Sequence, residues 1–123
     1  MILVDTSVWI DHLRHGDKAI QEVLNADRAV MHPFVLGELA CGNLKNRREL
    51  LSLWADLPAA RMATDEEALA FIERRALMGK GIGYMDVHLL ASVALDAGTR
   101  LWTRDKRLAT VAESLHLNFA EHK

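Results

Sequence analysis

Four acidic residues fall where a protein of alternating strands and helices can use them for chemistry. Asp5 follows the apolar run Met1–Val4, which has the pattern of a buried parallel strand. Glu38 lies about a turn and a half into an apolar helical segment, Asp86 lies in the first turn of another helix, and Asp105 directly follows a short apolar run. Strand ends and the helix starts that follow them share one edge of an α/β sheet. We therefore expect the four acids to converge.

Converging carboxylates define a narrow range of chemistry. Held within a few ångströms of one another, they repel and either take up protons or bind a cation. A set of oxygen ligands without His or Cys suits the hard ions Mg²⁺ or Mn²⁺ rather than zinc. Because such ions keep water ligands and bind phosphate oxygens, the residues point to hydrolysis of phosphodiester bonds.

Each acid also has a purely structural alternative. Asp5 can cap the helix that follows it, Asp86 can interact with the dipole of its own helix, and Asp105 can cap the helix that begins at Lys106. Glu38 differs, because the rest of its segment is apolar and an unpaired acid is costly in an apolar surround. No single acid decides between these interpretations.

The surrounding pattern predicts the elements that position these acids. Strands are expected at 1–4, 28–32, 99–103 and 116–119. Helices are expected at 7–13, 18–26, 33–42, 47–57, 64–79, 84–98 and 106–115. Thr64 and Glu67 have the spacing of a capping box, and Pro33 suits the first position of a helix. Strands that alternate with helices predict a parallel sheet covered on both faces.

Length and composition limit the class of protein. A chain of 123 residues, 50% of them hydrophobic and 26% charged, is expected to form one soluble domain over 1–123. No stretch is long enough to cross a bilayer, and the first strand lacks the features of a signal peptide. Cys41, the only cysteine, excludes an internal disulfide and suits the reducing cytoplasm, and we expect it to be a small buried side chain. The three tryptophans are expected in the core.

Charge gives only a local indication of a nucleic-acid partner. The formal net charge of −2 does not indicate nucleic-acid binding by the chain as a whole. Basic residues nevertheless cluster around Asp105, within the segment TRDKR. Such a cluster is either a solvated surface or a contact to a phosphate backbone.

Four segments, in this order and spacing, resemble the PIN-domain ribonucleases and most closely the VapC toxins of bacterial toxin–antitoxin pairs. They are ILVDTSVWID, ELACG, GYMDVHLLASVAL and LWTRDKRL. The resemblance runs along the whole chain. It implies a PIN-like three-layer α/β/α domain with a central, mostly parallel sheet of four to five strands.

The resemblance also implies roles for individual residues. The protein would be an endoribonuclease that cuts RNA with one or two Mg²⁺ or Mn²⁺ ions. Asp5 would be the central metal ligand, Asp86 and Asp105 would complete the metal site, and Glu38 would hold or activate the attacking water. The supporting hydroxyls would be those of Thr6, Ser7 and Thr103. The RNA backbone would contact Arg104, Lys106 and Arg107.

Two partners follow from the same resemblance. A cognate VapB-like antitoxin would cover the active-site groove, which the helical segments 11–24 and 47–54 would form. A second copy of the chain would form a homodimer through the late helices. His88 departs from the family pattern, which has an apolar residue there, and we expect a side chain at the core edge or surface without a role in the site.

Three other interpretations stay open. A haloacid-dehalogenase-like phosphatase also begins with a strand ending in Asp, but it needs a second Asp where this chain has Ser7. A phosphorylated receiver module needs an acidic pair, a central aspartate and a late lysine in an order that the chain lacks. The third is a catalytically silent PIN-like binding scaffold, which the complete set of four acids argues against.

Overall fold

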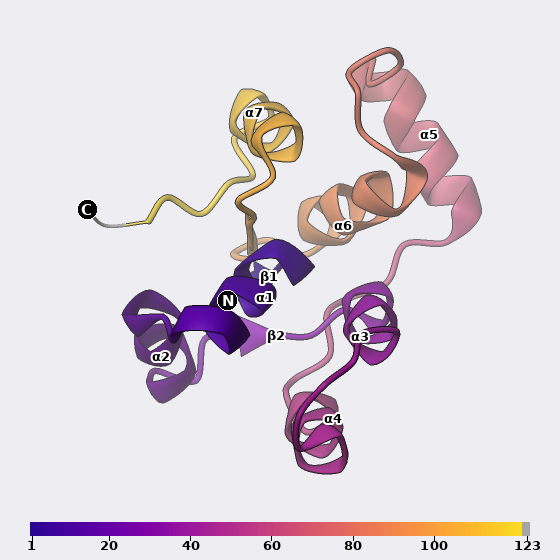
Figure 1. The fold of residues 1–123 in the computed structure, drawn as a ribbon. Helices are drawn as coiled ribbons and strands as arrows, with labels where there is room; N and C mark the ends of the chain where they lie inside the picture. Colours follow the sequence, from indigo (N-terminus) through magenta and orange to yellow (C-terminus); the bar gives the residue numbers. More distant parts are fainter. Residues whose placement is uncertain (122–123) are drawn as a thin grey trace.

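A three-stranded parallel sheet runs through the middle of the protein (Figure 1). The structure is a computed structural model, and it describes residues 1–121. The strands are β1 (Ile2–Val4), β2 (Ala29–Val30) and β3 (Arg100–Trp102), in the order β2-β1-β3. β1 is central and all its residues are buried, as its unbroken apolar pattern predicts. Since all strands are parallel, their carboxyl ends meet at one edge.

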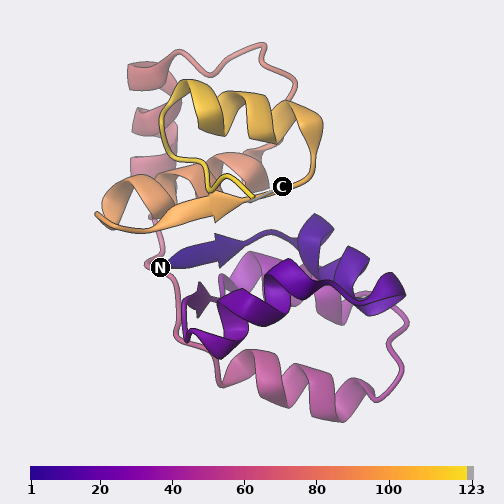
Figure 2. The ribbon, with the colours of Figure 1, turned by 90° about the vertical axis from the view of Figure 1, so that its left-hand side faces the viewer.

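Seven helices surround the sheet within the described residues. They are α1 (Thr6–His15), α2 (Lys18–Asn25), α3 (Pro33–Ala40), α4 (Arg47–Ala55), α5 (Asp65–Arg75), α6 (Tyr84–Leu95) and α7 (Lys106–Ser114). In Figure 1 the sheet is seen nearly edge on, with α2 on the left and α3, α5 and α6 on the right. Figure 2 shows β1 and β3 side by side, with α5, α6 and α7 in the half of the molecule that contains β3. Helices thus cover both faces, which confirms the predicted α/β fold.

The sheet is narrower than predicted. We expected four to five strands, but residues 1–121 form three, and a single bridge extends each edge: Met31 with Ala59, and Leu101 with Asn118. The predicted strand at 116–119 is reduced to one of these bridges. The chain leaves α7 through a turn at His116, whose φ is +59°, and then lies beside β3 only briefly.

The ends of α5 show how local sequence sets helix boundaries. The capping box at its start is present, with Thr64 and Glu67 each accepting from the other's backbone N–H. The helix ends at Arg75, earlier than predicted, because Ala76 adopts a left-handed conformation. The next residue, Leu77, is buried, and its N–H donates to the carbonyl of Ile72, the 6→1 hydrogen bond of a Schellman motif at a helix end.

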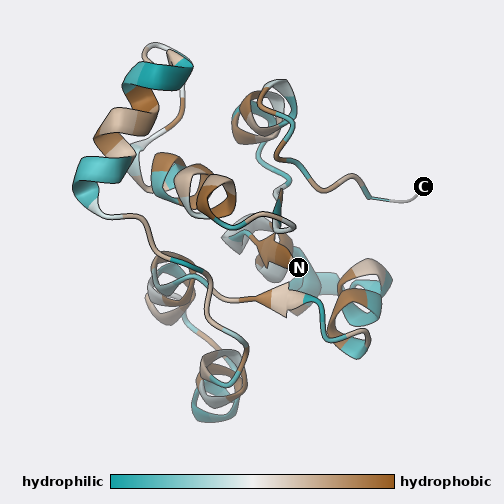
Figure 3. Ribbon diagram, turned by 180° about the vertical axis from the view of Figure 1, so that it is seen from behind, coloured by the Kyte–Doolittle hydropathy of each residue, from teal (hydrophilic) through white to brown (hydrophobic). Residues whose placement is uncertain are grey.

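The core lies on both faces of the sheet and confirms the expected position of the tryptophans. Trp9, Trp54 and Trp102 are all buried. Figure 3 shows hydrophobic strands and a largely hydrophobic α6, whereas the two ends of α5 are hydrophilic. Cys41 is exposed just beyond the end of α3, so the expectation of a buried cysteine is wrong. Among residues 1–121, no helix combines the length and apolar character needed to cross a membrane.

Candidate active site

Asp5 lies where β1 ends, and two hydroxyl groups fix its carboxylate. Its Oδ2 accepts hydrogen bonds from Thr103 Oγ1 at 2.7 Å and from Ser7 Oγ at 3.0 Å. Thr103 directly follows β3, so the pairing of β1 with β3 brings it to Asp5 across 98 residues of sequence. Within the described part of the chain, Oδ1 makes no hydrogen bond. The side chain is therefore oriented while one oxygen stays available to a ligand.

Asp86 and Asp105 each cap a helix with one carboxylate oxygen. The Gly83 N–H donates to Asp86 Oδ2 at 3.1 Å, and the Leu108 N–H donates to Asp105 Oδ1 at 3.0 Å. The capping alternative is thus correct for Asp105, and Asp86, for which only a dipole interaction was expected, also caps its helix. Capping uses one oxygen of each, and the other makes no hydrogen bond to residues 1–121. Capping and ligand binding are compatible at these two positions.

The pKa shifts of two of the acids are caused in part by neighbouring acids, and Asp86 is coupled to both Asp5 and Asp105. Desolvation raises the pKa of Glu38, and the charges of Asp5 and Asp86 raise it further. Desolvation also raises the pKa of Asp86, against the Gly83 N–H, and the charges of Asp5 and Asp105 add to the increase. Elements far apart in sequence thus bring these carboxylates together at the edge of the sheet.

The surroundings of Glu38 differ from those that the sequence predicts. Glu38 is exposed, while Val35 and Leu39 of the same helix are buried. The expectation that Glu38 lies in an apolar surround is therefore wrong. Its raised pKa comes from partial desolvation together with two neighbouring carboxylates, not from enclosure in the core.

The donor chemistry of the four acids fits a hard divalent cation. All donors are carboxylate oxygens, the ligands that Mg²⁺ and Mn²⁺ prefer. Within residues 1–121, no group of three or more His, Cys, Asp or Glu side chains is close enough together to hold one ion directly. Mg²⁺ usually keeps several waters and takes one or two carboxylates directly, so such spacing suits it.

The predicted supporting hydroxyls do not behave alike. Ser7 Oγ donates to Asp5 and accepts the N–H of Arg104 at 3.0 Å, and it lies 3.4 Å from Thr103 Oγ1. Thr6 is buried, and its hydroxyl has no hydrogen-bond partner among the described residues. Ser7 and Thr103 therefore contact the acid site directly, whereas Thr6 does not.

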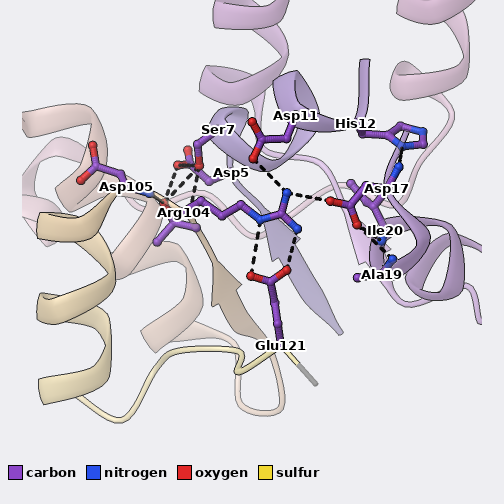
Figure 4. Close-up of polar contacts among 11 residues, drawn as sticks. Asp5, Ser7, Asp11, His12, Asp17, Ala19, Ile20, Arg104, Asp105 and Glu121 are labelled. Atoms are coloured by element: carbon purple, nitrogen blue, oxygen red, sulfur yellow. Dashed lines mark hydrogen bonds and ion pairs between the residues drawn. The ribbon is translucent and has the colours of Figure 1, made fainter. Parts of the chain in front are cut away.

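Of the three basic residues predicted to contact RNA, Arg104 is the most enclosed. Its guanidinium contacts the carboxylates of Asp11, Asp17 and Glu121 (Figure 4). We call these four residues the Arg104 clamp. The clamp holds the pKa of Asp17 below its usual value and raises the pKa of Arg104. Sequence reasoning did not find this clamp, whose members come from separate parts of the chain.

Lys106 and Arg107, by contrast, are exposed in the first turn of α7. The side chain of Arg107 lies against Gly81, where a Cβ would come within 3.0 Å of it. Gly81 has a φ of +78°, a conformation that favours glycine at this position. This contact brings the loop before α6 next to the start of α7.

A second polar cluster that sequence reasoning missed surrounds His88. The side chain is buried, and its Nε2 lies 3.1 Å from Asp65 Oδ1, which also accepts from Tyr84 at 2.7 Å. His32 is fully buried nearby, and desolvation together with the charge of His88 lowers its pKa to about 4. We expected His88 at the core edge or surface, and this expectation is wrong because the side chain is buried. The cluster ties α5 to the first turns of α6.

An apolar pocket of about 410 Å³ opens between α1, α2 and α4. It is lined by Trp9, His12, Leu13, Leu24, Leu50, Leu53, Trp54 and Leu57. The rings of Trp9 and Trp54 meet edge to face at its base, with centroids 5.9 Å apart. Leu53 is 64% exposed, which leaves a large apolar side chain uncovered at the rim.

Comparison with known proteins agrees with this geometry. Residues 2–114 match the family described as PIN domain. Two relatives carry the name Ribonuclease VapC32 and come from Mycobacterium tuberculosis, strains CDC 1551 / Oshkosh and ATCC 25618 / H37Rv. Each is 53% identical over 115 residues, which is 93% of this chain and 93% of the relative. The resemblance predicted from four segments is confirmed, and this chain belongs to the PIN-domain family, among its VapC-type ribonucleases.

Proposed function

We propose that this chain is the endoribonuclease toxin of a toxin–antitoxin pair, acting in the cytoplasm as a single PIN domain over 1–123. It would hydrolyse RNA phosphodiester bonds with Mg²⁺ or Mn²⁺ at the four acids. One observation carries the proposal: Asp5, Glu38, Asp86 and Asp105 gather at one edge, and no Lys or Arg of residues 1–121 pairs with any of them. The ribonuclease relatives, 53% identical, supply the substrate class.

Each acid has a role that its geometry supports. Asp5, Asp86 and Asp105 would hold the cation, some directly and the others through its water ligands, with the oxygens that hydrogen bonds leave available. A divalent ion bound there supplies Lewis acidity, which acidifies a water and neutralises charge developing on the phosphate. Glu38 would accept a proton from the attacking water, and its raised pKa suits a general base.

Lys106 and Arg107 are the proposed contacts to the RNA backbone. Both are exposed and follow Asp105 directly, so a phosphate bound to them lies close to the acids. We also predicted that Arg104 contacts the RNA backbone, but a phosphate there would compete with the three carboxylates that its guanidinium already contacts.

The apolar pocket between α1, α2 and α4 is the proposed docking surface for a VapB-like antitoxin. Its lining combines buried tryptophans with the exposed Leu53, as an interface core does. It lies in the helical segments that the family resemblance assigns to that groove. A homodimer through the late helices remains part of the proposal.

The direct test is incubation of the purified protein with structured RNA and Mg²⁺ or Mn²⁺. We expect cleavage that a chelator stops and that Asp86→Asn abolishes. Asp56→Asn, an exposed aspartate at the end of α4, is the matched control and should cleave normally. Hydrolysis of small phosphate esters without RNA cleavage would identify a phosphatase. No cleavage under any condition, with intact antitoxin binding, would identify a silent scaffold.

A further inference from the structure

The loop of residues 103–105 is hydrogen-bonded to Asp5 and Ser7 through both its backbone and its side chains. Thr103 donates its hydroxyl to Asp5, and the Asp105 N–H donates to Thr103 Oγ1 at 3.1 Å. Between them, the Arg104 N–H donates to Ser7 Oγ, which itself donates to Asp5. The position of this loop therefore sets where Asp105 and Thr103 lie relative to Asp5.

The side chain of Arg104 anchors the same loop to three other parts of the chain. Its Nη1 lies 2.9 Å from Asp11 Oδ2 in α1 and 2.7 Å from Asp17 Oδ2 in the turn before α2. Its Nη2 lies 2.5 Å and its Nε 3.4 Å from the two oxygens of Glu121. Arginine suits this position, because its planar group of donors bridges several carboxylates at once.

The anchors are themselves fixed. Asp11 lies four residues after Ser7 on α1, so one face of that helix holds both the backbone and the side chain of Arg104. Asp17 also accepts the N–H groups of Ala19 and Ile20 at the start of α2. Glu121 lies three residues beyond Asn118, and the parallel bridge of Asn118 with Leu101 holds this segment beside β3.

The direction and the charge of this arrangement argue against a contact with substrate. In Figure 4 the Arg104 side chain extends away from Asp5 and Asp105 toward Asp11 and Asp17. Three carboxylates surround one guanidinium, so the clamp carries a net negative charge. An RNA phosphate would have to displace these carboxylates and would be repelled by those that remained.

We propose that Arg104 is a positioning residue: its clamp fixes Thr103 and Asp105 relative to Asp5, and it does not contact RNA. The expected effect on RNA cleavage rests on the proposed function. The positioning role replaces the RNA contact that we expected of Arg104.

Asp11→Asn gives the sharpest test, because the two roles predict opposite results. If Arg104 positions the loop, loss of one anchoring charge lowers kcat and Mn²⁺ affinity about tenfold and leaves KM for RNA unchanged. If Arg104 contacts RNA, weakening a competing carboxylate lowers KM and leaves kcat and Mn²⁺ affinity unchanged. The second result overturns the proposal. Glu113 is an exposed acid in α7 whose side chain makes no hydrogen bond or ion pair to the described residues, so Glu113→Gln is the matched control and should match wild type.

Salt dependence of RNA binding gives an independent test with Arg104→Lys and Lys106→Gln. A residue that neutralises a phosphate of single-stranded RNA contributes about 0.7 to the slope of log affinity against log salt. Lys106→Gln should reduce this slope. Arg104→Lys should leave it unchanged while kcat falls, since lysine cannot bridge three carboxylates. Because Lys keeps the charge, Arg104→Gln completes the series, and a reduced slope there contradicts the proposal.

Amide hydrogen exchange separates this proposal from the proposed function. In Asp11→Asn without metal or RNA, the N–H groups of Arg104 and Asp105 should exchange at least several times faster, while those of β1 stay protected. Unchanged exchange overturns the positioning role even if the protein cleaves RNA. Faster exchange in a protein that does not cleave RNA supports the clamp and rejects the nuclease.

Discussion

Two groups of carboxylates lie side by side at the same edge of the sheet, and they differ in where their counter-charge comes from. Asp11, Asp17 and Glu121 surround a guanidinium that the chain provides. The four acids of the candidate active site have no such partner within residues 1–121. The pKa of Asp17 is accordingly lowered, whereas the pKa values of Glu38 and Asp86 are raised.

This contrast separates structural acids from acids kept for a ligand. A carboxylate beside an arginine gains from being charged and stabilises the fold. Carboxylates held beside one another repel when they are charged, and this repulsion lowers the free energy of unfolding. A fold that keeps them together therefore gives up stability for function. The loop of residues 103–105 joins the two groups, since Asp105 belongs to one and Arg104 to the other.

The largest expected effect comes from removing the central acid. Asp5→Asn should reduce RNA cleavage by about a thousandfold or more, because the ion accounts for several kcal/mol of transition-state stabilisation. Calorimetry with Mn²⁺ should show that binding is lost in the same variant. If Asp5→Asn bound Mn²⁺ like wild type, the contrast between the two groups would have no functional meaning.

A smaller effect is expected from the hydroxyl that orients Asp5. Thr103→Val keeps the shape of the side chain but loses its 2.7 Å hydrogen bond, so Mn²⁺ affinity should fall about 10- to 100-fold. Thr110→Val, on the exposed face of α7, is the matched control. Equal affinities in the two variants would show that the hydroxyl does not matter to the cation.

Asp17→Asn should lower the free energy of unfolding by about 1 kcal/mol at neutral pH, since Asn still caps α2 but loses the ion pair. The folded-state pKa of Asp17 lies below its unfolded value, so its contribution is complete above about pH 4. The difference from wild type should shrink as the pH falls through the lowered pKa. Urea denaturation across this range measures it, and a constant difference contradicts the ion-pair explanation.

On stability, Asp86→Asn should have the smallest effect, and one opposite in sign to that of Asp17→Asn. Without added metal, it should raise the free energy of unfolding by about 0.5 kcal/mol at neutral pH, since relief of repulsion and desolvation outweighs a weaker helix-dipole interaction. The folded-state pKa of Asp86 is raised, so its charge costs stability above that pKa. The gain should disappear as the pH falls below about 4. A loss of stability at neutral pH would place Asp86 with the structural acids.

Much of this architecture is readable along the chain because it depends on local patterns. The unbroken apolar run before Asp5 predicts the central strand, and Thr64 with Glu67 predicts the start of α5, and both are observed. Edge structure was harder to predict, because pairing at 116–119 depends on how the chain turns at His116. Glu38 was chosen for an apolar surround that it does not have, since the pattern of a helix does not reveal which neighbours leave a face open.

The sequence by itself determined the order of the elements, the family, and the acids that end strands or begin helices, because each of these depends on residue types and short-range spacing. Only the tertiary structure decided which acids share a neighbourhood and which receive a cation from the chain. Asp11 and Asp86 are both acids within helices, yet Asp11 lies 2.9 Å from a guanidinium, whereas the charges of two other carboxylates act on Asp86. Coulomb interactions act through space, so their sign at each residue follows from the folded arrangement.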